Sequence, residues 1–514
     1  AENVSSVAFS PDGQILAAGT QESTVALWDV ASGKFLANLL SLDDQDWLVV
    51  TPDGLFDGSP AAWNQILWRF SPQLYDVSPV EIFFNEYYSP GLLSELFNGK
   101  RPRAATNIEQ KDRRPPQLKI SVGEGSSANS ISTRRVKVRL DITAAPAGAQ
   151  DVRLFRNGSL VKVWRGDALK GQTRATLETE ISMTAGENRL TAYAFNRDNV
   201  KSTDATLIIN GADSLKRTGT AYLLAIGVNQ YENPQFNLRF AVADATDFAA
   251  ELHQQQTRLN RYERVSVVSL MDARATKAAI LKALADIAAQ AQPEDAVVVY
   301  FAGHGTAVQN QFYLIPHDLG YRGARNQITE ASVKLVLAHS ISDRDLERAF
   351  ETINAGQLLL VIDACNSGQA LESAEKRRGP MNSKGLAQLA YEKGMYVLTA
   401  SQSYQAAIEP EDLKHGLLTY TLIEEGLKRA DADADPKDGT ILLREWLNYA
   451  SERVPQLQRQ RMQESSKRKF VLAYVEGEER LLKVESRNVQ RPRVFYRREL
   501  ESQPFVILSA SPKQ

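Results

Sequence analysis

The chain has 514 residues, 43% of them hydrophobic and 24% charged, which places it among ordinary globular proteins and predicts about three domains. Its 60 Lys and Arg nearly balance its 62 Asp and Glu, so no positive field exists to hold nucleic acid, and we expect no nucleic-acid partner. No apolar run reaches the roughly 18 residues that a membrane span needs, and Ala1-Glu2 begins no signal peptide. We therefore expect a cytoplasmic protein without a membrane span.

The first 60 residues carry a near-repeat, Phe9-Ser10-Pro11-Asp12-Gly13 and Val50-Thr51-Pro52-Asp53-Gly54, with a period typical of propeller blades. Between the copies, Val25-Ala26-Leu27-Trp28-Asp29 resembles the end of a WD40 repeat, although the usual opening Gly-His is absent. One blade cannot bury both of its faces, so we expect further blades before residue 1; an isolated hairpin packed on the next domain is the alternative. We predict a WD40-like blade remnant at residues 1–60, then a connector and basic linker at 61–116.

Residues 117–212 are predicted to form an immunoglobulin-like β-sandwich. Alternating apolar residues mark strands at 152–154 and 160–163, joined by Asn157-Gly158, the pair that best tolerates the positive φ of a type I′ turn. Further strands are expected at 188–195 and 205–209. Such a module serves as a spacer or binds a protein partner.

After residue 217 the pattern changes to short apolar runs at 222–226, 265–268, 297–301, 358–362 and 396–398, which is typical of buried parallel strands. Helical stretches at 244–255, 276–290 and 342–354 alternate with them, and Ser342 with Asp345 predicts a capping box. This alternation predicts an α/β domain over 218–460, a mostly parallel sheet flanked by helices. Residues 461–514 are expected to form a strand-containing tail.

Two chemically active residues follow strands of this sheet. His304 stands in Gly303-His304-Gly305 after the 297–301 strand, and Cys365, the single cysteine, follows the 358–362 strand. Carboxyl ends of parallel strands are where chemistry sits, and a thiolate nucleophile needs a nearby imidazole. The glycines are expected to let a substrate backbone approach. The alternative is a buried apolar cysteine and an unrelated core histidine.

Gly303-His304-Gly305 and Asp363-Ala364-Cys365-Asn366-Ser367-Gly368 resemble the catalytic motifs of caspase-like peptidases, the metacaspase and orthocaspase branch of the C14 family. The resemblance extends from 222–229 to His415-Gly416-Leu417-Leu418-Thr419-Tyr420. It implies a caspase-like fold, with Cys365 as the nucleophile, His304 as the general acid and base, and an oxyanion hole from the amides of Gly305 and Cys365.

The same resemblance assigns Asp363 and Asp244 to the pocket for the substrate residue before the cut. Two buried acids call for a cation, so we expect cleavage after Arg or Lys of protein or peptide substrates. Ala302 stands where many metacaspases carry Ser, which leaves the choice between Arg and Lys open. The expected function is a cysteine endopeptidase. The alternatives are a catalytically idle scaffold and another thiol peptidase of the same clan.

Two further segments carry weaker signals. Residues 433–445 resemble a calcium loop in their acids, Gly439 and Glu445, but the register puts Ala434 and Pro436 where the first ligands belong. We expect a capped surface turn and no required cofactor or metal, with calcium activation as the alternative. The exposed 369–393 segment is expected to be a linker, and the resemblance implies self-cleavage there, after Lys376, Arg377 or Arg378.

Overall fold

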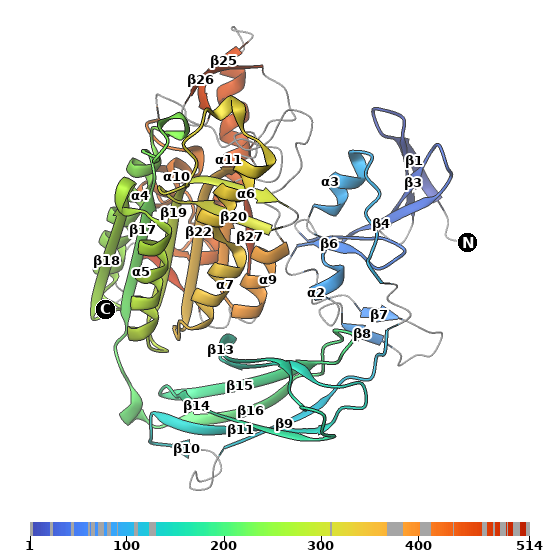
Figure 1. Ribbon diagram of the computed structural model, residues 1–514, viewed down its shortest axis with the longest axis vertical. Helices are drawn as coiled ribbons and strands as arrows, with labels where there is room; N and C mark the ends of the chain where they lie inside the picture. Colours follow the sequence, from blue (N-terminus) through green and yellow to red (C-terminus); the bar gives the residue numbers. More distant parts are fainter. Residues whose placement is uncertain are drawn as a thin grey trace.

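The computed structural model describes the chain in several ranges, shown as a ribbon in Figure 1. They are residues 4–20, 24–42, 46–59, 62, 67–69, 77–79, 84–89, 91–106, 111–122, 130–308, 311–366, 384–400, 413–434, 436–464, 470–475, 478–483, 490, 492–496 and 504–509. The strands form separate sheets, and the largest of them belongs to the predicted α/β region.

The N-terminal sheet is antiparallel and follows chain order from β1 to β6. Leu92 and Leu96 pack against its apolar side chains, so part of the predicted connector covers this sheet. The first strand is exposed along its whole length. The elements are β1 (Val4–Phe9), β2 (Ile15–Thr20), β3 (Thr24–Asp29), β4 (Phe35–Ser41), β5 (Trp47–Val50), β6 (Phe56–Gly58), β7 (Leu67–Arg69), β8 (Val77–Pro79), α2 (Phe84–Tyr87) and α3 (Leu92–Phe97).

Two sheets with a common core form the next region, as the alternating pattern predicts. Their strand orders are β10-β16-β15-β12-β13 and β14-β11-β9, and both contribute side chains to one apolar cluster. Asn157 and Gly158 have φ values of 50° and 81°, which confirms the predicted turn. The strands are β9 (Gln117–Val122), β10 (Ser130–Ile131), β11 (Arg135–Ala144), β12 (Gln150–Arg156), β13 (Ser159–Asp167), β14 (Ala175–Ser182), β15 (Gly186–Phe195) and β16 (Ala205–Gly211).

The central sheet of the α/β region has the order β18-β17-β19-β22-β23-β27, parallel except for β27. Val267 and Val268, expected to be buried, are 39% and 38% exposed, because β18 is an edge strand. The strands are β17 (Thr220–Gly227), β18 (Arg264–Met271), β19 (Ala296–Val308), β20 (Gln311–Ile315), β21 (Ile341–Ser342), β22 (Gln357–Asn366), β23 (Tyr396–Thr399), β24 (Thr440–Leu442), β25 (Phe470–Val475), β26 (Glu478–Lys483), β27 (Arg493–Phe495) and β28 (Val506–Ser509).

Helices flank this sheet (Figure 1). Ser342 with Asp345 forms the expected capping box of α7, and the structure adds a cap by Thr276 at the start of α5. The elements are η3 (Asp213–Leu215), η4 (Pro234–Phe236), α4 (Ala241–Leu259), η5 (Asp272–Arg274), α5 (Lys277–Gln290), η6 (Arg325–Gln327), α6 (Glu330–His339), α7 (Asp343–Glu351), α9 (Lys384–Lys393), α10 (Leu417–Tyr420), the π-helical η7 (Thr421–Lys428) and α11 (Leu443–Glu464).

The C-terminal tail contributes to the same core. Strand β28 pairs with β24, and β27 adds an antiparallel strand beside β23. The half-buried Arg493 guanidinium lies 2.6 Å from Asp57 Oδ1 of β6. The tail therefore extends the central sheet and connects it to the N-terminal sheet.

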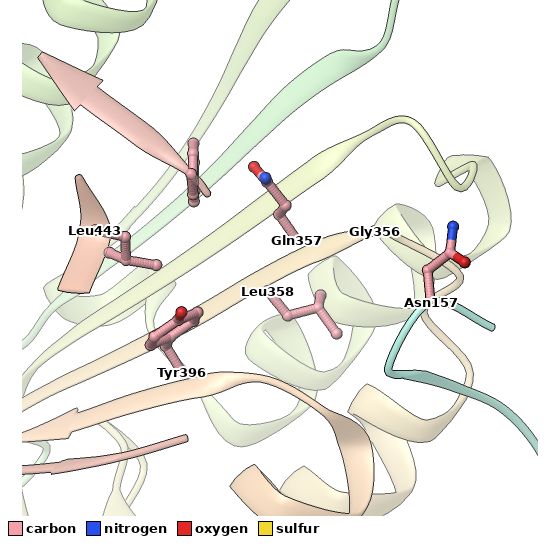
Figure 2. Close-up of a pocket in the computed structure, with 7 residues that line it drawn as sticks. Asn157, Gly356, Gln357, Leu358, Tyr396 and Leu443 are labelled. Carbon is pink, nitrogen blue, oxygen red and sulfur yellow. The ribbon is translucent and has the colours of Figure 1, made fainter. Parts of the chain in front are cut away.

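A buried lysine joins the β-sandwich to the α/β region. Lys393 Nζ donates to the carbonyls of Leu160 and Ile353 at 2.9 and 2.8 Å, and burial lowers the pKa of Lys393 to about 7. Figure 2 shows a small pocket at this junction, between the Asn157 turn, Gly356 at the start of β22, and Tyr396. It lies at the opposite end of β22 from Cys365.

Candidate active site

The predicted dyad residues occupy paired positions on neighbouring strands. In the parallel pairing of β19 with β22, His304 is opposite Cys365, and Ala302 is opposite Asp363. From the sequence, His304 and Cys365 are expected after the ends of their strands, but β19 and β22 both continue through these residues. Antiparallel pairing with β20 keeps the end of β19 extended. The fold therefore brings the two residues together at the level of the backbone.

His304 is a fully buried imidazole with one hydrogen-bonded nitrogen. Its Nε2 lies 2.7 Å from the carbonyl oxygen of Phe236, and because a carbonyl only accepts, we assign the ring hydrogen to Nε2. Nδ1 then carries the lone pair, and it has no hydrogen-bond partner among the described residues. Burial lowers the pKa of His304 to about 3. The arrangement supplies a neutral imidazole with one unused proton-accepting nitrogen.

Tyr231 and Phe236 hold this ring in place. The Tyr231 ring centroid is 4.9 Å from that of His304, and its hydroxyl accepts the His304 backbone N–H at 2.7 Å. A Cβ on Gly303 would lie 3.0 Å from Tyr231 Oη, and one on Gly305 would lie 3.1 Å from the Phe312 ring. Both glycines thus allow close packing around His304, a role that the sequence analysis did not foresee.

The two predicted pocket acids also come together. Asp244 lies in the first turn of α4, Asp363 lies in β22, and they are 3% and 8% exposed. Gly416 lies between them: a Cβ built there would be 3.2 Å from Oδ2 of each acid. The Gly416 N–H also donates to both oxygens of Asp244 at 3.2 Å. Because position 416 is glycine, the space between the two carboxylates stays open.

Each acid has hydrogen-bond donors that support its charge. Thr419 Oγ1 and the Tyr300 hydroxyl donate to Asp363 Oδ2 at 2.7 and 3.2 Å. Burial raises the pKa of Asp363. Burial also raises the pKa of Asp244 to about 7, against the opposing effect of the hydrogen bond from His415. Ala302 is buried and offers no polar side-chain atom there.

Four residues around these acids escaped the sequence analysis. His415 places Nδ1 2.8 Å from Asp244 Oδ1. Gly416 and Thr419 belong to the 415–420 segment, which the family resemblance includes without assigning a role to either residue. Tyr300 lies inside an apolar run, and nothing in that run distinguishes its hydroxyl from an ordinary core tyrosine.

The segment that resembles a calcium loop forms a capped turn. Asp433 accepts the backbone N–H groups of Asp438 and Gly439 at 3.1 and 2.9 Å, and Glu445 accepts that of Leu442 at 2.8 Å. Within the described ranges, no group of three or more His, Cys, Asp or Glu could hold a metal ion.

Two other expectations concern the wider chain. Lys376, Arg377 and Arg378 lie outside the described residues. Among the helices that are described, none is long and apolar enough to cross a membrane.

Comparison with known proteins finds sequence similarity to the α/β region. Residues 220–471 match the family model of the caspase domain, Peptidase C14. Metacaspase-1B of Aspergillus fumigatus is 28% identical over 182 residues, covering 32% of this chain and 40% of that protein. Metacaspase-1B of Aspergillus clavatus is 27% identical over 168 residues, covering 30% and 37%. The matched region thus spans well under half the length of these relatives.

A solved structure of a Geobacter sulfurreducens protein is 17% identical, with a TM-score of 0.32, and covers 46% of this chain and 89% of that one. Residues 220–471 are therefore similar in sequence to the caspase domain family and to part of the metacaspases.

Proposed function

We propose that this caspase-type domain hydrolyses peptide bonds after Arg or Lys, with Cys365 as the nucleophile and His304 as the general acid and base. The observation that carries the proposal is the pairing of His304 with Cys365 on adjacent strands. It is supported by the buried Nδ1 of His304, which has no partner among the described residues.

The reaction proceeds in two steps. Nδ1 of His304 accepts the thiol proton while the Cys365 sulfur attacks the substrate carbonyl carbon. The tetrahedral oxyanion collapses to a thioester as the imidazolium gives its proton to the leaving amine. A water molecule, deprotonated by the same nitrogen, then attacks the thioester and releases the carboxylic acid and the thiol. Backbone N–H groups of Gly305 and Cys365 stabilise the oxyanion in this proposal.

The preference for a basic residue follows from the acid pair. A cation about 4 Å from one carboxylate, at an effective dielectric constant near 20, gains roughly 4 kcal/mol before desolvation. Even about 2 kcal/mol favours a basic side chain over a neutral one of similar size by about thirtyfold. Tyr300, which contacts Asp363, and His304 fall on the same face of β19 by strand alternation. One substrate residue could therefore present its side chain to the acids and its carbonyl to the dyad.

The remaining modules are proposed to regulate or target the peptidase. We retain the division into a WD40-like blade remnant (1–60), a connector (61–116), a β-sandwich (117–212), the peptidase domain (218–460) and a tail (461–514). The β-rich modules would bind protein partners in the cytoplasm. We also propose self-cleavage after Lys376, Arg377 or Arg378. Mass spectrometry should then find a cut there in the wild type and none in Cys365→Ala.

A peptide library tests the central proposal. The wild type should cut after Arg and Lys and ignore peptides with Asp before the cut, while Cys365→Ala should cut neither. Efficient cleavage after Asp would exclude the basic pocket. A folded wild type that cuts no peptide would favour the idle scaffold.

A further inference from the structure

His415 contacts Asp244, one of the two buried acids, and the exposed Asp247 of the same helix. Its Nδ1 is 2.8 Å from Asp244 Oδ1, and its Nε2 is 3.3 Å from Asp247 Oδ2. The imidazole side chain is 12% exposed, and that of Asp247 is 50% exposed. The ring thus bridges a buried carboxylate and a solvated one, while the next residue, Gly416, borders the space between Asp244 and Asp363.

This geometry leaves one side of Asp244 available to a ligand. Oδ1 receives His415 and the Gly416 N–H, whereas Oδ2 accepts only that N–H among the described contacts. Asp244 Oδ2 and Asp363 Oδ2 each lie 3.2 Å from the point where a Cβ on Gly416 would stand, so both oxygens border the same position. A substrate cation can therefore reach Asp244 without displacing His415.

Charge balance gives His415 a function beyond packing. Two buried carboxylates repel each other, and without a nearby cation one of them takes up a proton near neutral pH. Among the described residues, the groups that act most strongly on the imidazole are Asp244 and Asp247 of α4, Glu424 of η7 and Asp363, while Lys428 of η7 acts on Asp247 and Glu424. The hydrogen bond to Asp244 raises the pKa of His415. An imidazolium here leaves the buried trio of Asp244, Asp363 and His415 with one net negative charge, the charge that one Arg or Lys side chain neutralises.

We propose that His415 is a positioning residue of the basic-specificity pocket, whose imidazolium keeps Asp244 ionised and directs its Oδ2 toward the entering substrate cation. The inference rests on the proposed function, since it assumes that the acid pair receives Arg or Lys. It adds a residue that acts on the substrate only through Asp244.

The pH profile of cleavage tests this role. We would measure kcat/KM for an arginine peptide from about pH 5.5 to 9, a range that brackets the pKa of Asp244. Replacing His415 by Asn should shift the acid limb upward by about one pH unit, because a charge within ~4–6 Å moves a carboxyl pKa by at least about that much. His253→Asn, an exposed histidine of the same helix as Asp244, should leave the limb in place.

A uniform loss at every pH, with the limb unmoved, would mean that His415 has a packing role only and would overturn the inference. If His415→Asn does not fold, His415→Gln replaces it: the neutral amide keeps a hydrogen-bond donor at this position without the positive charge, and the limb should again shift upward. An unmoved limb in that variant would equally overturn the inference.

A binding measurement separates this inference from the proposed function. Benzamidine, an amidinium probe, should bind Cys365→Ala more weakly at pH 6 than at about pH 8, and the difference should grow when His415→Asn is added. If the wild type neither cuts after Arg or Lys nor binds benzamidine, both proposals fail. If it does both and His415→Asn leaves both pH profiles unchanged, only the role of His415 fails.

Discussion

The α/β region buries two polar sites beside β19 and β22, and their hydrogen-bond partners differ. His304 has one carbonyl as the hydrogen-bond partner of its ring, and burial lowers its pKa to about 3. Asp244 and Asp363 are just as enclosed but have several donors, including the His415 imidazole. Burial favours the neutral form of His304 and of both acids, and the donors around the acids oppose that effect, so the number of partners decides how far each pKa moves.

The largest expected loss of activity follows from replacing His304 or Cys365. His304→Ala and Cys365→Ala should each lower kcat/KM for an arginine peptide by about 10³-fold or more, and the double change should cost little beyond either one, because the two residues act in one step. The exposed His253→Ala serves as the control. Additive losses in the double variant would show that the two residues act independently.

Removing the charge of Asp363 should lower kcat/KM less than removing His304 or Cys365 does. Asp363→Asn keeps the side-chain shape and should lower kcat/KM for Arg and Lys peptides by about thirtyfold. The rate at which iodoacetamide labels Cys365 should stay unchanged, because the pocket and not the thiol is altered. Asp286→Asn, an exposed acid of α5, is the matched control. Equal losses in both assays would instead assign Asp363 to the support of Cys365.

The two sites should also differ in their pH response. The pKa of Asp244 is about 7, so its carboxyl is protonated below pH 7, and at pH 6 kcat/KM for an arginine peptide should be about tenfold below its alkaline plateau. His304, with a pKa of about 3, stays neutral throughout this range and adds no limb. Asp244→Asn should abolish the limb. Full activity of the wild type down to pH 5 would contradict the assignment.

The smallest effect is expected from filling the space between the acids. Gly416 has φ −60° and ψ 149°, a conformation that alanine adopts without strain. Gly416→Ala should lower kcat/KM severalfold, and more for arginine than for lysine peptides, because the guanidinium is the larger group. Labelling of Cys365 by iodoacetamide provides the control. An unchanged preference between the two peptides would place the substrate cation elsewhere.

Local patterns in the sequence account for much of the fold. Continuous apolar runs predicted β17, β19, β22 and β23, since a strand covered on both faces has no polar positions. The capping residue Ser342 located the start of α7, because a cap acts on N–H groups within a few residues. The Asn157-Gly158 turn was predictable for the same local reason. The motifs around His304 and Cys365 also identified β19 and β22, the two strands that pair beside the candidate site.

Tertiary structure alone decided which distant groups share an environment. No local pattern relates His415 to Asp244, Tyr300 to Asp363, or the Phe236 carbonyl to His304, because each pair is joined across different elements. The edge position of β18, and with it the exposure of Val267 and Val268, likewise depends on strand order. Secondary structure follows from interactions over a few residues. The partners that set the charge of a buried group are chosen by the packing of the whole domain.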